Sequence, residues 1–292
     1  MNRRNVLGNR IEESKTLWVV LTGILVACLQ FIIYHFVASE VAGVILAALC
    51  MLLGTAVVHF ITKEQEEFLG FLLIPCAFSG IFGILAQHMD IVIFPSSTVA
   101  LWSALFSYLI PMVYALVYTC VMGNTEASAF SKVYIKGNVI FYAVYFGLMI
   151  YAVVTKISMK GTAAGLQPIP FSTVADLVDG WLKHTVPGEA VAGFFVSRIV
   201  FFLPYGFFVG MVARKLHGAV RILMIVSLPF VGELLEYIMK QGTADADDVI
   251  FRILGTFLGV IVFYILDAVF QYFTGRHMDG SEIDRDYYGR KI

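Results

Sequence analysis

The sequence predicts an all-α polytopic membrane protein with about eight transmembrane helices and one amphipathic helix at the membrane surface. Two observations predict this class. The 292 residues are 59% hydrophobic and only 14% charged, whereas a soluble domain carries about 25% charged residues. The hydrophobic residues also gather in separate runs of about 20, the length of helix that crosses a ~30 Å hydrocarbon core. The net charge of −1 gives no reason to expect a nucleic-acid partner.

Eight hydrophobic runs are expected to span the membrane, each bounded by charged residues, glycine, asparagine or proline. They are residues 17–37, 41–61, 68–87, 98–122, 137–155, 190–213, 219–238 and 249–271. The first run is too long for a signal-peptide core and no cleavage site follows it, so it is expected to stay in the mature protein. A polar stretch near residue 130 predicts a four-span region over 1–130, a second four-span domain over 131–273 and a flexible tail over 274–292.

The basic residues predict the orientation of these spans, because retained Lys and Arg mark the cytoplasmic side. Of the 20 Lys and Arg residues, fourteen fall on one side of the arrangement and four on the other, and Arg198 and Arg252 lie inside spans. Both termini are therefore expected to be cytoplasmic in a multi-pass plasma-membrane protein.

The outward connection 156–189 contains the predicted amphipathic helix, over 171–184. Its apolar residues recur at helical spacing, as expected for a helix lying at the membrane interface. They are Phe171, Val174, Leu177, Val178, Trp181 and Leu182. Pro168, Pro170 and Pro187 would bound such a helix. The alternative is a plain surface loop.

Charged residues interrupt the last three spans at similar depth. Glu233 and Glu236 share a face in the outer third of the seventh span, and Asp248 and Arg252 share a face where the eighth begins. Arg198 lies in the outer half of the sixth span. An ionisable group inside a span costs about 3 kcal/mol and normally faces the bundle interior. The candidate ligand-binding or polar-network residues are therefore Arg198, Glu233, Glu236, Asp245, Asp248 and Arg252.

Two interpretations of these charges stay open. One is an ion-pair network that holds three helices together, with Glu233 or Glu236 against Arg198 and Arg252. The other is a functional polar pocket, which is favoured because replacing buried ion pairs by apolar residues is often neutral or stabilising. On the first interpretation Asp245 and Asp247 are a solvated turn after Gly242, and Asp248 caps the last span.

The remaining polar and small residues indicate packing. Gly206 and Gly210, like Gly255 and Gly259, have the four-residue spacing that lets membrane helices approach closely. The four Cys and six His show no paired metal-ligand spacing, so no metal, cofactor or disulfide is expected. No phosphate-binding glycine loop or nucleophile elbow is present either, so the sequence supports no catalytic residues of the soluble-enzyme type.

Three segments in order, LQPIPFSTV, RIVFFLPYGFF and GELLEYIMKQGTADADDVIFRILGTFLG, resemble the VanZ-like membrane proteins of bacteria. The resemblance covers roughly residues 137–271. It rests on Pro170, Phe171, Phe202, Pro204, Gly206, Glu233, Gly242, Asp245, Asp248, Gly255 and Gly259. It implies a four-span bundle with a role in the bacterial envelope. A named member of the family is associated with resistance to teicoplanin, a lipid-bearing glycopeptide antibiotic that acts at the outer surface of Gram-positive bacteria.

The chain departs from the family pattern at four polar positions. Arg198 and Arg252 stand where the family usually has asparagine, Glu236 where it has glutamine, and Thr243 where it has arginine. Polarity is kept while charge is rearranged, so the ligand preference of the family does not transfer automatically to this chain.

The sequence leaves three functions open. The first is a non-enzymatic protein that binds or modulates an outer-face ligand: a lipid headgroup, a cell-wall precursor or a glycopeptide. In it Arg198 and Arg252 would hold a phosphate or carboxylate, with membrane lipids as further partners. The second is an intramembrane enzyme acting on a lipid headgroup, with Glu233 or Glu236 as general base. The third is a small-solute transporter. The oligomeric state is not predicted.

Overall fold

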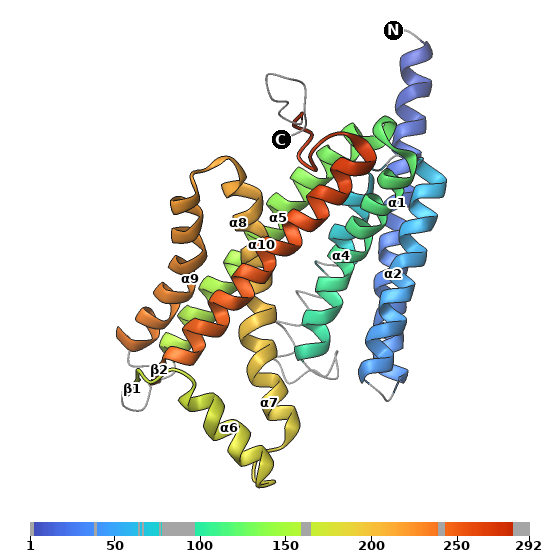
Figure 1. Ribbon diagram of the computed structural model, residues 1–292. Helices are drawn as coiled ribbons and strands as arrows, with labels where there is room; N and C mark the ends of the chain where they lie inside the picture. The colour runs from blue at the N-terminus through green and yellow to red at the C-terminus, as the bar shows by residue number, and fades with distance from the viewer. Residues whose placement is uncertain are drawn as a thin grey trace. The chain divides into compact units, whose positions relative to one another are not determined.

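The computed structural model describes residues 3–37, 40–63, 65, 67–75, 77, 97–158, 165–238 and 243–282. Helices make up most of this part of the chain (Figure 1). The long helices are α1 (Arg3–Phe36), α2 (Glu40–Thr62), α4 (Ser97–Met122), α5 (Asn124–Ser158), α9 (Gly218–Ile238) and α10 (Ala246–Thr274). The shorter elements are β1 (Gly165–Gln167), α6 (Ser172–Leu182), α7 (Gly188–Phe195), the π-helix η1 (Val196–Val200), α8 (Phe201–Val212), the 3₁₀ turn η2 (Ala213–Lys215) and β2 (Thr243–Asp245).

Six described segments are long and apolar enough to cross a membrane. They are Lys15–Phe36, Ala42–Thr62, Leu105–Met122, Gly188–Lys215, Gly218–Leu235 and Ala246–Thr274. Each overlaps one of the predicted spans, and α5 includes the predicted span 137–155 within one continuous helix. Most of the predicted span 68–87 lies outside the described residues. The all-helical polytopic membrane class is confirmed, and the number of eight spans stays a prediction.

The chain forms two compact units. The first comprises Met1–Phe141 and Phe270–Ile292, and the second comprises Tyr142–Val269. The boundary that the sequence suggested near residue 130 falls inside α5. In this helix Glu126 is half-buried and Lys132 is exposed, and the division of the chain near residue 130 stays a prediction.

Inside the first unit, α1 and α2 pack through small residues. A Cβ placed on Gly54 would lie 2.6 Å from Cγ2 of Val26 and 2.8 Å from Cζ of Phe71. A buried polar contact joins the end of this helix pair to α4, because the Nε2 of Gln65 donates to Thr119 Oγ1 at 3.2 Å. The described contacts of this unit thus include close helix packing and a buried hydrogen bond between neutral side chains.

Inside the second unit, α8 and η1 meet α10 backbone to backbone through glycine. A Cβ on Gly206 would lie 1.8 Å from the carbonyl oxygen of Thr256. A Cβ on Gly255 would lie 2.3 Å from that of Ile199, and one on Gly259 would lie 2.1 Å from that of Leu203. A Cβ on Gly210 would lie 2.8 Å from Cδ1 of Phe263. No larger residue fits at these positions without separating the helices.

The segment before α6 pairs with the turn before α10, which the sequence did not predict. β1 and β2 form a two-stranded parallel sheet in which Gly165, Leu166 and Gln167 pair with Thr243, Ala244 and Asp245. This short sheet brings the beginning of α6 beside the first turn of α10.

The predicted amphipathic helix over 171–184 is confirmed as α6, which runs from Ser172 to Leu182. Phe171, Val178, Trp181 and Leu182 expose their side chains on one face of this helix. The placement of that face at a membrane surface stays a prediction.

Candidate functional site

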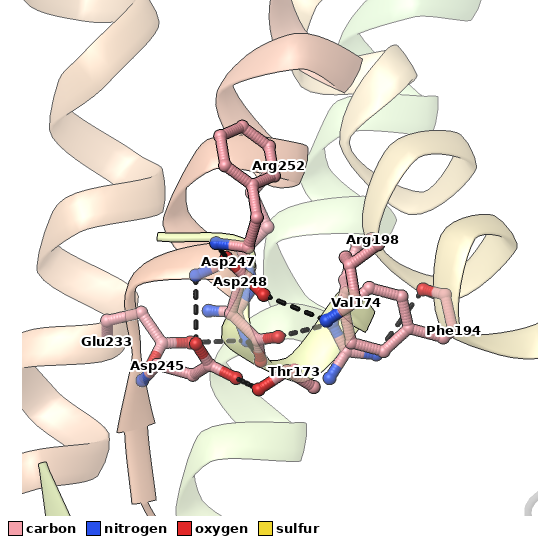
Figure 2. Close-up of polar contacts among 10 residues, drawn as sticks. Thr173, Val174, Phe194, Arg198, Glu233, Asp245, Asp247, Asp248 and Arg252 are labelled. Atoms are coloured by element: carbon pink, nitrogen blue, oxygen red, sulfur yellow. Dashed lines mark hydrogen bonds and ion pairs between the residues drawn. The ribbon is translucent and has the colours of Figure 1, made fainter. Parts of the chain in front are cut away.

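Charged side chains from three helical segments and β2 converge in the second unit (Figure 2). Arg198 comes from η1, Glu233 from α9 and Asp245 from the end of β2. Asp247, Asp248 and Arg252 come from the first two turns of α10. We call these six residues the charged cluster. Glu236, the remaining sequence candidate, lies on α9, and its side chain is outside the described residues.

A chain of ion pairs runs through the charged cluster. The Nε of Arg198 donates to Oδ1 of Asp248, whose Oδ2 lies 3.3 Å from Nη2 of Arg252. The same Nη2 lies 2.7 Å from Oε1 of Glu233. The pairing of Glu233 with Arg252 was among those expected from sequence. Arg198 instead pairs with Asp248, so Asp248 bridges two cations and does not act only as a helix cap.

The members of this chain differ in burial. The side chain of Glu233 is 6% exposed and that of Asp248 is 12% exposed. The side chain of Arg252 is 12% exposed and that of Arg198 is 25% exposed. Ionised groups this buried are stable only when paired and hydrogen-bonded. Arg198 is the most exposed member of this chain of ion pairs, so an external molecule would reach the ion pairs most easily at Arg198.

The π-helix fixes the position of Arg198. Its guanidinium stacks on Phe194, with Cζ 3.8 Å from the ring centroid, and Nη1 donates to the Phe194 carbonyl at 3.3 Å. A π-helical turn is wider than an α-helical one and recurs at functional sites. Here the turn carries Arg198 toward α10 while Ile199 rests against Gly255.

Asp247 belongs to the charged cluster, although the sequence did not place it among the candidate site residues. The solvated-turn interpretation of Asp247 is wrong, because this side chain is 0% exposed. Its Oδ1 accepts a hydrogen bond from the backbone N–H of Phe171, and its Oδ2 accepts one from that of Val174 at 3.1 Å. Both donors belong to the first turn of α6, where the N-cap residue Phe171 offers no capping side chain. Asp247 therefore caps α6 from a distant part of the chain.

Asp245 is equally engaged. Its Oδ2 accepts a hydrogen bond from the hydroxyl of Thr173, and its Oδ1 accepts one from the backbone N–H of Asp247 at 2.9 Å. Its own N–H donates to Oε2 of Glu233 at 3.4 Å. These bonds connect α6, β2, α9 and α10 through the charged cluster. Asp245 is only half-buried, so for this residue the solvated-turn interpretation stays a prediction.

Hydrogen bonds from α5 complete the surroundings of α8 in this unit. The hydroxyl of Tyr145 donates to the carbonyl of Phe201 at 2.9 Å, and that of Tyr142 donates to the carbonyl of Pro204 at 3.1 Å. A backbone carbonyl has two lone pairs, so each of these oxygens can accept a hydroxyl in addition to a bond within the helix. Within the described parts of the chain, no group of His, Cys, Asp and Glu is arranged to hold a metal ion.

A comparison with models of known protein families found a match to the part of the chain that contains the charged cluster. Residues 139–267 match the family model described as VanZ/LLP1. This region is VanZ-like. The match confirms the resemblance seen in the sequence and contains every member of the charged cluster. A search of curated proteins and a search of solved structures found no match.

Proposed function

We propose that this VanZ-like membrane protein binds an anionic group of an envelope ligand at the charged cluster, on the outer face of a bacterial plasma membrane. The observation that carries the proposal is the bridging position of Asp248 between Arg198 and Arg252. A phosphate or carboxylate that approaches the more exposed Arg198 takes the place of the Asp248 carboxylate, so the Arg198 guanidinium stays paired, and Asp248 keeps Arg252 as its partner.

The ligand classes are a lipid headgroup, a cell-wall precursor and a glycopeptide such as teicoplanin. Each presents a phosphate or a carboxylate at the outer surface. The ligand is proposed to have an apolar part as well. The exposed side chain of Phe171 lies beside the charged cluster, because the Phe171 N–H donates to Asp247. In the proposed role the protein binds such a ligand and modulates its action. Both termini of the chain lie in the cytoplasm.

Binding is favoured over the enzyme and transporter alternatives by how the carboxylates are used. Glu233, Asp245, Asp247 and Asp248 each accept from an N–H, hydroxyl or guanidinium group. A general base needs a carboxylate that can reach a substrate proton, and these four side chains are committed to partners of the protein itself. The side chain of Glu236, the other candidate base, is outside the described residues. The transporter alternative would need a polar route at the membrane midplane, for which the described residues provide no specific support.

The direct test is ligand binding by the full-length protein in lipid nanodiscs, comparing wild type with Arg198→Gln. The probes are teicoplanin, a lipid-linked cell-wall precursor and an anionic phospholipid. We expect at least one probe to bind and to lose about tenfold in affinity in the variant, the worth of one charge-assisted pair. The control is Lys183→Gln, an exposed cation on the same predicted face that pairs only with nearby Asp179 among the contacts described. Equal affinity in wild type and Arg198→Gln would remove Arg198 from the binding site.

A cellular test follows from the same proposal. A teicoplanin-sensitive Gram-positive host would express either wild type or Glu233→Gln, with membrane levels matched by immunoblot. Reduced susceptibility with wild type that disappears in the variant would connect the charged cluster with the glycopeptide. Unchanged susceptibility with both proteins would exclude teicoplanin and leave the other two ligand classes.

A further inference from the structure

The first unit contains a hollow that lies outside the VanZ-like region. It has a volume of about 390 Å³ and is lined by Ala56, His59, Phe60 and Lys63 of α2 and its end, and by Tyr114 and Tyr118 of α4. All six of these residues precede the 139–267 family match. The hollow therefore needs an explanation independent of the charged cluster.

Aromatic rings form its inner wall. The His59 Nδ1 and the Tyr114 hydroxyl lie 3.1 Å apart. The His59 ring also meets the rings of Tyr118 and Phe68 edge to face, with centroids 4.3 Å and 5.5 Å apart. Such pairs fix ring orientation, so the wall is preformed.

A single lysine stands at the rim. α2 ends at Thr62, and Lys63 follows in the left-handed region with φ 59°. Its N–H donates to the carbonyl of His59 at 2.8 Å, which closes the last turn of the helix. The Lys63 side chain is exposed and lines the hollow. The hollow thus combines an aromatic wall with a cation at the end of a membrane-spanning helix.

The surface around the hollow is strongly apolar. Phe60 is 84% exposed and Val121 is 76% exposed, and Val117 beside Tyr118 is also exposed. In a membrane such side chains face lipid chains. α4 ends at Met122 and α2 at Thr62, so the hollow lies in the last turns of both helices, the level at which lipid headgroups begin.

We propose that this hollow is a binding site for a glycerophospholipid of the adjoining leaflet. The Lys63 ammonium holds the phosphodiester, the hydroxyls of Tyr114 and Tyr118 face the polar glycerol region, and one acyl chain lies along Phe60 and Val117. The single positive charge of exposed Lys63 complements the single negative charge of a phosphodiester. By the predicted orientation this is the cytoplasmic leaflet, opposite to the leaflet proposed for the charged cluster, so the two proposals stand or fall separately.

Photocrosslinking of the full-length protein in proteoliposomes tests this site. One probe is a phospholipid with a diazirine on its acyl chain, and the other is a diacylglycerol with the same chain and no phosphate. We expect the phospholipid to label peptides covering 56–63 and 113–121 about tenfold more than the diacylglycerol does, as expected when a charge-assisted bond is lost. Excess inorganic phosphate should not reduce this labelling. Competition by phosphate would identify a free-anion site and overturn the lipid assignment.

Two variants make the test specific. Lys63→Gln removes the proposed phosphate partner, and Ala56→Phe fills the hollow while keeping the lysine. Both should lose the excess labelling by the phospholipid, whereas Lys136→Gln, at an exposed lysine of α5, should keep it. Helix content by circular dichroism and a single peak in size-exclusion chromatography establish that each variant is folded. Equal labelling by both probes, or full labelling of folded Lys63→Gln, would overturn the proposal.

Discussion

The charged cluster of the second unit and the aromatic hollow of the first unit place polar groups among membrane helices in different ways. In the charged cluster, ionised side chains are buried or half-buried and each described carboxylate has an N–H, hydroxyl or guanidinium partner. The hollow uses neutral aromatic contacts, and its lysine stands at the rim. Removing one member of a paired set leaves its partner buried and charged, whereas removing a neutral group loses one bond. Substitutions should therefore cost much more in the cluster than in the hollow.

The largest effect is expected for Asp248→Asn. This change leaves Arg198 and Arg252 without the carboxylate that separates them, and breaking a buried pair costs about 3–5 kcal/mol. The midpoint of thermal unfolding in detergent measures the loss. Asp179→Asn, at an exposed carboxylate paired only with Lys183 among the contacts described, is the control and should change stability by less than about 0.5 kcal/mol. A midpoint equal to that of wild type would mean that water or lipid compensates the two cations.

The next effect concerns the helix contact that supports the cluster. In Gly206→Ala the new methyl group would fall 1.8 Å from the Thr256 carbonyl oxygen, so α8 and α10 must move apart at a cost of about 3 kcal/mol. Gly193→Ala is the matched control, because a Cβ at Gly193 meets no atom within 4 Å. Equal unfolding midpoints for the two variants would show that α8 and α10 tolerate a wider separation. The charged cluster would then not depend on close packing of these two helices.

A smaller and more local effect is expected for Asp247→Asn. An amide keeps one acceptor oxygen, so α6 loses one of its two capping bonds and the favourable charge at its N-terminus, worth about 1–2 kcal/mol. Hydrogen exchange should become faster in α6 while the amides of α8 keep their protection. Asp176→Asn, on the exposed side of α6, should leave exchange unchanged. Unchanged exchange in Asp247→Asn would mean that the sheet of β1 and β2 suffices to hold α6.

The difference between the two regions also explains what could be predicted from sequence. Charges such as Glu233 and Arg252 are conspicuous in apolar runs, and glycines four residues apart indicate close packing, so most of the cluster and its scaffold were found. Asp247 was missed because its partners are backbone N–H groups 73 and 76 residues away, brought near by a parallel sheet of three-residue strands. The available signal was the apolar N-cap Phe171, which left the α6 N-terminus in need of an acceptor.

Nothing comparable marked the hollow. His59, Tyr114 and Tyr118 are ordinary residues for the ends of membrane helices, and only the packing of α2 against α4 shows that they share one site. A neutral aromatic site depends on which helix faces meet. Composition and spacing contain little information about that pairing.

The smallest effect is expected in the hollow, for Tyr114→Phe. This change removes the hydroxyl that meets His59 Nδ1 but keeps the ring stacked edge to face on His59 and Phe68, so stability should fall by only about 1 kcal/mol. The unfolding midpoint measures this cost against that of Val113→Ala, a neighbouring exposed position that should be close to neutral. Because the proposed lipid site keeps Lys63 and its ring wall in this variant, labelling by the phospholipid probe should fall much less than in Lys63→Gln. A loss of stability as large as that of Asp248→Asn would mean that His59 depends on this hydroxyl as strongly as Arg252 depends on its carboxylates, and the contrast between the two regions would not hold.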